Sequence, residues 1–248
     1  MPEQAPVVLI TGAAHRLGAA TALRLHQHGW RVLIHHRSRP QQAATLAARM
    51  NQDRPDSARV LQADLALADA VTRLGEEAYE AWGRLDALVN NASAFYPTAT
   101  CSATQTDWAT LMDTNLRAPF FLVQACLPAL ATRGGCIVNL IDIYSERPLA
   151  DHPLYCASKA GLAALTKAWA KELAPQVRVN GVSPGAILWP EGDAAVNEDY
   201  QQSILDKTPL ARTGSPDDIA RTVTFLICDA PFMTGQILAV DGGRSLNM

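Results

Sequence analysis

Short apolar runs alternate with longer amphipathic stretches along almost the whole chain. Val7-Val8-Leu9-Ile10 is a continuous apolar run, which is typical of a strand buried on both faces of a parallel sheet. We expect seven strands, at residues 7–11, 31–36, 59–64, 85–90, 136–141, 178–182 and 236–241. Apolar positions recur with helical spacing at residues 17–28, 41–50, 68–81, 106–130, 154–173 and 216–228. Gly29 is expected to end the first helix, and Ser215 to cap the last one.

This alternation indicates the fold class. Strands separated by helices form a parallel sheet with helices on both faces, which is the doubly wound, Rossmann-type α/β architecture. No linker, repeat or low-complexity segment interrupts the pattern, so residues 1–248 are expected to form a single domain. The connection at about residues 186–214 is rich in Pro, Gly and acidic residues and is unusually long. We expect this connection to act as a substrate lid.

Composition narrows the class of protein. The 248 residues carry a formal net charge of −3, and 48% of them are hydrophobic. This apolar content is typical of a folded chain, and the mild negative charge argues against nucleic-acid binding. No apolar run approaches the ~20 residues that a membrane-spanning helix needs. The five cysteines are odd in number and widely spaced, which favours free thiols. We therefore expect a cytoplasmic protein that binds neither nucleic acid nor a membrane.

A glycine-containing turn follows the first expected strand. Residues 11–18 are Thr-Gly-Ala-Ala-His-Arg-Leu-Gly. Such a turn lets the backbone approach a pyrophosphate group at the positive N-terminus of the first helix. The residues expected to contact a dinucleotide here are Gly12, Arg16, Leu17 and Gly18. Arg16 stands where a middle glycine is usual, and the two glycines alone would also suit a tight turn without a ligand.

The end of the second expected strand indicates which dinucleotide is bound. Folds that bind NAD usually carry an acidic residue here, which holds the 2′-hydroxyl group of the ribose. This chain has His36, Arg37 and Ser38 instead, and a guanidinium group suits a 2′-phosphate. We therefore expect NADPH as the cofactor. At the end of the third strand, Asp64 and the following Leu65 are expected beside the adenine, although a helix cap is the alternative role for Asp64.

Tyr155 and Lys159 lie four residues apart on one expected helix and therefore share a face. A phenol has an unperturbed pKa near 10, so it is a poor acid at neutral pH. A neighbouring ammonium group favours the phenolate, which we expect to lower the pKa of Tyr155 and to ease proton transfer. The pair therefore indicates a proton-donating site, in which Lys159 would also bind the nicotinamide ribose.

Further motifs follow in a fixed order. Asn90-Asn91-Ala92 ends the fourth strand, Asn115 lies in the next helix, and Ser183-Pro184-Gly185 follows the sixth strand. Together with the glycine turn and the Tyr-x-x-x-Lys pair, these motifs resemble the short-chain dehydrogenase/reductase family across nearly the whole chain.

The resemblance implies roles for these residues. Asn115 would join Tyr155 and Lys159 in a proton relay. Further cofactor contacts, around the ribose and the nicotinamide, would be Asn91, Ala92, Ser93, Pro184 and Gly185. The family also implies that the chain assembles as a homotetramer.

Three departures from the usual family pattern point to one branch. Asp142 stands thirteen residues before Tyr155, where most of the family has a serine. Arg16 replaces a glycine, and Ser93-Ala94-Phe95-Tyr96-Pro97 replaces the small residue that usually follows Asn-Asn-Ala. These departures resemble the pteridine reductase branch, close to the bacterial dihydromonapterin reductases.

The branch implies NADPH-dependent reduction of a dihydropterin, either dihydrobiopterin or dihydromonapterin. A pterin is a flat aromatic ring with a polar edge, so it needs an aromatic face and hydrogen-bonding partners. Hydride would go to a ring carbon, and Tyr155, supported by Asp142 and Lys159, would protonate the adjacent nitrogen. The expected substrate contacts are Arg16, Ser93, Phe95, Asp142 and Tyr155. Plain core packing is the alternative role for Phe95.

Two other functions stay open. A carbonyl reductase of the same fold would act on oxoacyl thioesters, sugars or steroids, although Asp142 and Phe95 argue against it. A non-catalytic sensor of NADPH or pterins would have no need for Tyr155 and Lys159. No pair of histidines has metal-ligand spacing, so we expect no metal site.

Overall fold

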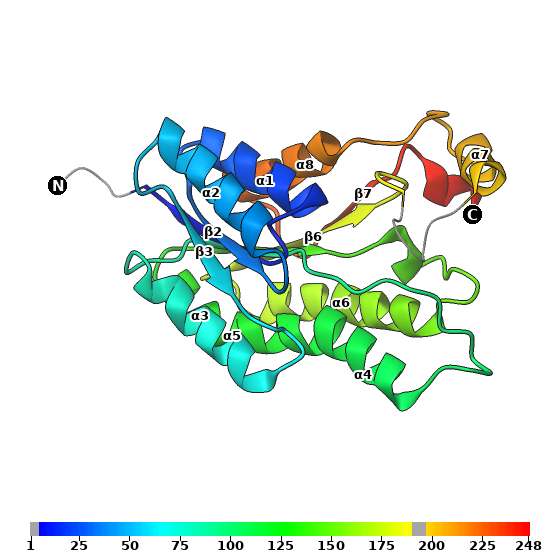
Figure 1. The fold of residues 1–248 in the computed structure, drawn as a ribbon, viewed down its shortest axis with the longest axis horizontal. Helices are drawn as coiled ribbons and strands as arrows, with labels where there is room; N and C mark the ends of the chain where they lie inside the picture. Colours follow the sequence, from blue (N-terminus) through cyan, green and yellow to red (C-terminus); the bar gives the residue numbers. More distant parts are fainter. Residues whose placement is uncertain (1–4, 190–196) are drawn as a thin grey trace.

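The computed structural model describes residues 5–189 and 197–248 (Figure 1). Within these residues, parallel strands form one seven-stranded sheet in the order β3-β2-β1-β4-β5-β6-β7. The strands are β1 (Val7–Ile10), β2 (Arg31–His36), β3 (Ala58–Gln62), β4 (Ala87–Asn90), β5 (Cys136–Leu140), β6 (Arg178–Pro184) and β7 (Ile237–Val240). The strand order reverses at β1, which pairs with β2 on one side and β4 on the other. The predicted doubly wound fold is confirmed, and such folds bind ligands where the order reverses.

Helices cover both faces of this sheet (Figure 1). One face carries α1 (Arg16–Gln27), α2 (Pro40–Asp53) and α8 (Pro216–Cys228). The other face carries α3 (Ala68–Glu80), α5 (Ala118–Ala131) and α6 (Pro153–Glu172). In the described residues, no helix is long and apolar enough to cross a membrane.

Strand β1 shows why the apolar runs are continuous. Val8 and Ile10 belong to the core beneath α1, α2 and α8, whereas Val7 and Leu9 belong to the core on the opposite face. All four side chains are fully buried. Because successive side chains of a strand point to opposite faces, a strand covered on both sides needs apolar residues at every position.

The expected helix ends are confirmed at two positions. Gly29 follows α1 with a φ of 89°, in the left-handed region that favours glycine. Ser215 caps α8 in a reciprocal arrangement with Asp218: the serine hydroxyl accepts from the Asp218 backbone N–H, and the Asp218 carboxylate accepts from the Ser215 backbone N–H.

The single helix expected at residues 106–130 is divided in the structure. It consists of α4 (Gln105–Met112), a π-helical turn η1 (Asp113–Arg117) and α5 (Ala118–Ala131). In this turn, the Ala118 N–H donates to the carbonyl group of Asp113, five residues earlier. Pro119 follows and has no N–H group to donate. A wide turn adds a residue without disturbing the apolar pattern on either side, so periodicity did not reveal it.

The long connection at 186–214 contains a helix that the sequence reading missed. This is α7 (Glu198–Asp206), and the side chain of Asn197 caps it by accepting from the Tyr200 N–H at 2.9 Å. Glu198 and Asp199 occupy its first turn, where negative charge is favourable. The acidic residues Glu198 and Asp199, which suggested an irregular loop, therefore begin a helix. Residues 190–196 of the predicted lid lie outside the described residues, and the lid role stays a prediction.

Candidate active site

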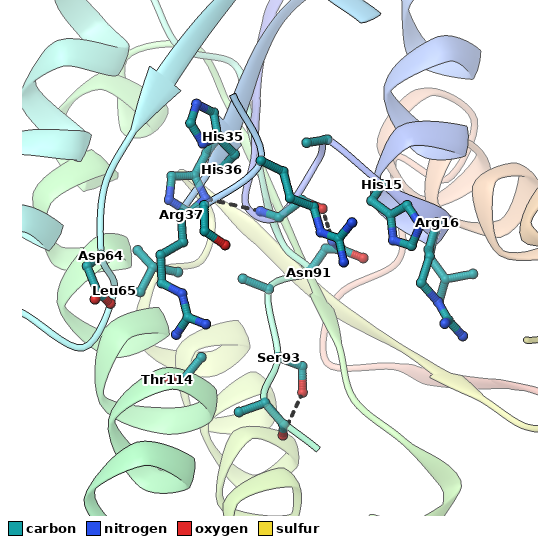
Figure 2. A pocket seen from close by; sticks show the side chains of 18 residues that line it. His15, Arg16, His35, His36, Arg37, Asp64, Leu65, Asn91, Ser93 and Thr114 are labelled. Atoms are coloured by element: carbon teal, nitrogen blue, oxygen red, sulfur yellow. Dashed lines mark hydrogen bonds between the residues drawn. The ribbon is translucent and has the colours of Figure 1, made fainter. Parts of the chain in front are cut away.

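A cavity of about 410 Å³ lies where β1, β2, β3 and β4 end (Figure 2). It brings together twelve of the residues predicted to bind the cofactor: Gly12, Arg16, Leu17, Gly18, His36, Arg37, Ser38, Asp64, Leu65, Asn91, Ala92 and Ser93. Its wall also includes residues that the sequence reading did not select: Ala14, His15, His35, Arg39, Ala94 and Thr114. Most of these are chain neighbours of predicted residues, so extending each motif by a residue or two would have found them.

The glycine turn is shaped by close packing. Gly12 has a φ of 63°, and a Cβ atom on Gly18 would lie 2.5 Å from the Gly12 carbonyl oxygen and 2.6 Å from Nδ2 of Asn91. Real Cβ atoms do not approach other atoms so closely, so position 18 requires glycine. Asn91 Nδ2 also donates to the carbonyl oxygens of Thr11, at 2.7 Å, and Gly12, at 3.1 Å. Asn91 therefore holds the turn in place as well as lining the cavity.

His35 is a second support of the turn. Its Nδ1 accepts from the Gly12 N–H at 3.1 Å, and its Nε2 lies 3.1 Å from the carbonyl oxygen of Ala63. Because Nδ1 accepts, the hydrogen sits on Nε2 and the ring is neutral. Burial lowers the pKa of His35 to about 4. Two adjacent histidines on a strand point to opposite faces, and the sequence did not show which of them faced the turn.

His36 lines the cavity with an unsatisfied atom. The residue is 4% exposed, and its Nδ1 has no hydrogen-bond partner among the described residues. Buried polar atoms are almost always paired, so a bound ligand is a natural source of the missing partner. Arg37 and Ser38 follow on the exposed rim, where Gln62 donates to the Arg37 carbonyl oxygen at 3.2 Å.

Asp64 and Arg16 each contact a neighbouring backbone segment. Asp64 lines the cavity and accepts from the Ala66 N–H at 3.0 Å, which holds the turn before α3. The N-cap of α3 is Leu67, so Asp64 does not have the helix-cap role considered as the alternative. Arg16 has a φ of 53°, and its Nη2 donates to the carbonyl oxygens of Leu188 and Trp189, both at 3.1 Å. Arg16 therefore joins the glycine turn to the beginning of the predicted lid.

The predicted proton donor lies on α6, beyond the cavity. Tyr155 Oη donates to Asp142 Oδ2 at 2.7 Å. The other oxygen, Oδ1, accepts from the Tyr144 N–H at 2.9 Å, in the short 3₁₀ turn η2 (Ile143–Ser145) that follows β5. Asp142 thus follows the end of β5, caps η2 and binds the phenol of Tyr155.

Burial dominates the acid–base properties of this pair. It raises the pKa of Asp142, against the hydrogen bonds from Tyr144 and Tyr155 and the charges of Lys159 and Arg244. Burial and the Asp142 charge also raise the pKa of Tyr155 well above its usual range. The phenol therefore keeps its proton. The expectation that Lys159 lowers the pKa of Tyr155 is not met in this structure.

Lys159 is held away from the phenol oxygen. Its Nζ donates to the Leu140 carbonyl oxygen at 2.8 Å and lies 5.9 Å from the centroid of the Tyr155 ring. Burial lowers the pKa of Lys159 to about 8, so it still carries a positive charge at neutral pH. The charge of Lys159 and that of Arg244 both lower the pKa of Asp142.

Asn115 supports the site from the π-helical turn. Its Nδ2 donates to the Ala94 carbonyl oxygen at 2.9 Å and to Ser158 Oγ at 3.0 Å. Its Oδ1 accepts from the Ala94 N–H at 2.8 Å and from Ser93 Oγ at 3.2 Å. The side chain therefore fixes the segment after β4 against α6. Its predicted part in a proton relay stays a prediction.

Phe95 covers the phenol of Tyr155. The two rings meet edge to face with centroids 4.7 Å apart, and Phe95 stacks on His152 at 4.8 Å. Tyr155 is 4% exposed. Pro184 ends β6 and Gly185 follows it, and neither is among the residues that line the cavity. The Gly185 N–H donates to the Val240 carbonyl oxygen at 3.0 Å. The site thus has a cavity lined by the residues predicted to bind the cofactor, and a separate buried acid pair beneath an aromatic ring.

Comparison with known proteins identifies the family. A family model described as enoyl-(acyl carrier protein) reductase matches residues 12–245. The chain is also 37% identical to pteridine reductase 1 of Leishmania tarentolae, over 98% of this chain and 97% of that protein. The chain belongs to the short-chain dehydrogenase/reductase family. The resemblance predicted from its motifs is confirmed.

Other members of the short-chain dehydrogenase/reductase family match almost as well. The 3-oxoacyl-[acyl-carrier-protein] reductase FabG of Staphylococcus aureus is 35% identical over 95% of this chain and 96% of its own length. FabG of Staphylococcus epidermidis is 34% identical over 95% and 97%. The chain is therefore an oxidoreductase of this family, whose members use nicotinamide cofactors.

The neutral His35 gives a prediction about stability. Its folded-state pKa of about 4 lies below the ordinary value of 6.5, so only the unfolded chain binds a proton between these values. Stability from His35 is therefore complete above pH 6.5 and is lost as the pH falls through about 4. We expect His35→Gln to remove this part of the pH dependence, on the order of 3 kcal/mol between pH 7 and pH 4.

Urea unfolding at pH 4, 5.5 and 7 measures the effect. His28→Gln is the matched control, because His28 is exposed at the end of α1. The control should follow the wild-type curve. If the free energy of unfolding changed with pH by the same amount in all three proteins, His35 would titrate alike in the folded and unfolded states.

Proposed function

We propose that this protein is an NADPH-dependent pteridine reductase that converts a dihydropterin to a tetrahydropterin. Dihydrobiopterin and dihydromonapterin are the candidate substrates. The hydrogen bond of 2.7 Å between Tyr155 and Asp142 carries the proposal. Both oxygens of Asp142 are already engaged, Oδ1 by the Tyr144 N–H and Oδ2 by Tyr155, so this group is not free to bind a ketone oxygen as a serine hydroxyl would. A carboxyl group with a raised pKa suits instead a basic ring nitrogen that must receive a proton.

The residues of the cavity fit the proposed cofactor. The turn from Gly12 to Gly18 lines the cavity at the start of α1, where a pyrophosphate would bind, and the unsatisfied Nδ1 of His36 lacks a partner that a ligand would supply. Arg37 and Ser38 would hold the 2′-phosphate, with Asp64 and Leu65 beside the adenine. When bound, NADPH supplies the hydride.

The proton would come from Tyr155. Its phenol is neutral and hydrogen-bonded to Asp142, so a proton lost to the substrate can be replaced from that carboxyl group. Hydride at a ring carbon and this proton at the adjacent nitrogen together convert a C=N bond to CH–NH. Lys159, charged and fixed on Leu140, would stabilise the negative charge left behind.

The aromatic and polar groups near Tyr155 suit a pterin. Phe95 lies against Tyr155, where its ring would pack on a flat heterocycle. Ser93 lines the cavity and is bonded to Asn115, which places its hydroxyl at the junction of the cavity and the acid pair. Arg16 lines the same cavity and would contact the polar edge of the substrate.

A 3-oxoacyl reductase is the second candidate function. The FabG relatives, at 35% and 34% identity, favour it. Asp142 argues against it, for the reason given above. A sensor without catalysis is the third possibility, and the buried, hydrogen-bonded Tyr155 argues against it. We also propose that the protein works as a homotetramer in the cytoplasm; the exposed Phe120 and Phe121 on α5 would suit a subunit contact.

A substrate panel separates these functions. Steady-state rates with NADPH would be measured for dihydrobiopterin, dihydromonapterin, dihydrofolate, oxidised biopterin and an acetoacetyl thioester. We expect kcat/KM for the best dihydropterin to exceed that for the thioester by roughly a hundredfold, because a site matched to one polar group rejects its mismatch. The opposite ranking would establish the carbonyl reductase instead.

Tyr155→Phe is the control in the same panel. It should lose most of the turnover while binding NADPH as tightly as the wild type, since the phenol supplies the proton. Tight pterin binding without any turnover by the wild-type protein would support the sensor.

Arg37 supplies a prediction on cofactor choice. Loss of a charge-assisted hydrogen bond costs about 1.5–3 kcal/mol. We therefore expect Arg37→Ala to weaken NADPH binding by roughly ten- to a hundredfold and NADH binding by less than about twofold. Calorimetric titration of both cofactors measures this. Arg49→Ala, on the exposed side of α2, is the control for the lost charge. Equal weakening of both cofactors would show that Arg37 does not bind the 2′-phosphate.

A further inference from the structure

A buried arginine lies at the C-terminal end of the chain. Arg244 is 7% exposed and begins the short 3₁₀ helix η4 (Arg244–Asn247). Gly242 and Gly243 turn the chain back, with φ values of 64° and 84°. A Cβ atom on Gly242 would lie 2.9 Å from Thr208, and one on Gly243 would lie 2.9 Å from Pro209. The C-terminal segment is therefore pressed against the residues that follow α7.

The Arg244 guanidinium joins two elements. Nη1 donates to the Ile204 carbonyl oxygen in α7, and Nη2 donates to Tyr144 Oη in η2, each at 3.4 Å. Both acceptors are neutral and both bonds are long. Within the described residues, no carboxylate lies within ion-pair distance of this guanidinium. A buried charge without an ionic partner is costly, so its position calls for a physical reason.

The reason lies on the other side of Tyr144. The backbone N–H of Tyr144 donates to Asp142 Oδ1, while its hydroxyl accepts from Arg244. The guanidinium and the carboxylate therefore hold the same short turn, η2. The positive charge of Arg244 also lowers the pKa of Asp142, opposing the effect of burial.

The other groups around Asp142 come from three elements. Helix α6 contributes Tyr155, Cys156 and Lys159, and η2 contributes Tyr144. Tyr200, in α7, acts on Tyr144. Lys159 is fixed to the Leu140 carbonyl oxygen within the sheet. Arg244 is thus the cation near Asp142 that the C-terminal segment contributes, and its contact with Ile204 links it to α7.

We propose that Arg244 is a positioning residue that ties α7 and the C-terminal segment to the Asp142–Tyr155 pair and sets the pH range in which that pair transfers a proton. The consequence for activity rests on the proposed function, in which Asp142 restores the proton of Tyr155. Activity then declines as the pH rises through the pKa of Asp142. Without the charge of Arg244, Asp142 keeps its proton to a higher pH.

Carboxyl-carbon NMR of aspartate-labelled protein tests this without any substrate. Asp142→Asn identifies the Asp142 resonance, and its titration is compared in the wild type, Arg244→Gln and Arg244→Lys. We expect the pKa of Asp142 to rise by roughly one unit in Arg244→Gln and to return close to the wild-type value in Arg244→Lys. Arg212 is an exposed arginine that follows α7, so Arg212→Gln controls for the change in net charge. It should leave the pKa of Asp142 unchanged.

If Arg244→Gln folds and the pKa of Asp142 in it equals that of the wild type, the proposal is overturned. If that variant does not fold, Tyr144→Phe serves instead, because it removes only the acceptor of Nη2. A rise in the pKa of Asp142 is then expected, and no change would overturn the positioning role.

The pH profile of kcat/KM for a dihydropterin gives the functional result. In Arg244→Gln the alkaline limb of this profile should move to higher pH by the same shift that NMR measures for Asp142. In Arg244→Lys the limb should return to its wild-type position. A limb that stays in place while the NMR titration moves would refute the link to catalysis. If the wild type reduces no pterin, the proposed function fails, and the NMR titration still decides the role of Arg244.

Discussion

The hydrogen bond between Tyr155 and Asp142 depends on nearly every layer of the fold. Asp142 is placed by the end of β5, a strand whose side chains are buried on both faces, and Tyr155 by the first turn of α6. Burial of both groups raises the pKa of each, so the proton stays within the pair until a substrate group can take it. In water the same two groups would be an unremarkable phenol and an ionised carboxylate. The enclosed core around them gives the pair its chemistry.

The cofactor cavity depends on a second constraint, the close approach of β1 and β4 where both strands end. Gly18 has no room for a side chain, and Asn91 and His35 use their hydrogen-bonding groups to hold the glycine turn. Asn115 then connects the cavity to the acid pair, because it binds Ala94 on one side and Ser158 on the other. The two parts of the site are therefore held in a fixed relation by polar contacts within a rigid sheet.

Much of this followed from the sequence because its signals are local. Continuous apolar runs fixed the strands, and the ends of parallel strands necessarily meet at one edge, which brought Gly12, Arg37 and Asn91 together. The π-helical turn at Asn115 was missed because the apolar pattern continues on either side of it, and α7 was missed because its acidic first turn resembles an irregular loop. The roles of His35 and Arg244 depend on which way a side chain points after folding. Burial, which only the complete fold determines, reversed the expected pKa shift of Tyr155.

The carboxyl group of Asp142 is the feature on which the proposed pterin specificity depends. Asp142→Ser places there the hydroxyl group that most of the family carries, and leaves the cofactor cavity unchanged. The decisive measurement is the ratio of kcat/KM for dihydrobiopterin to kcat/KM for an acetoacetyl thioester, in the wild type and in this variant. A fall of the ratio by roughly a hundredfold or more, with NADPH affinity preserved, is the result we predict. An unchanged ratio would contradict the claim that Asp142 directs the proton of Tyr155 to a pterin nitrogen.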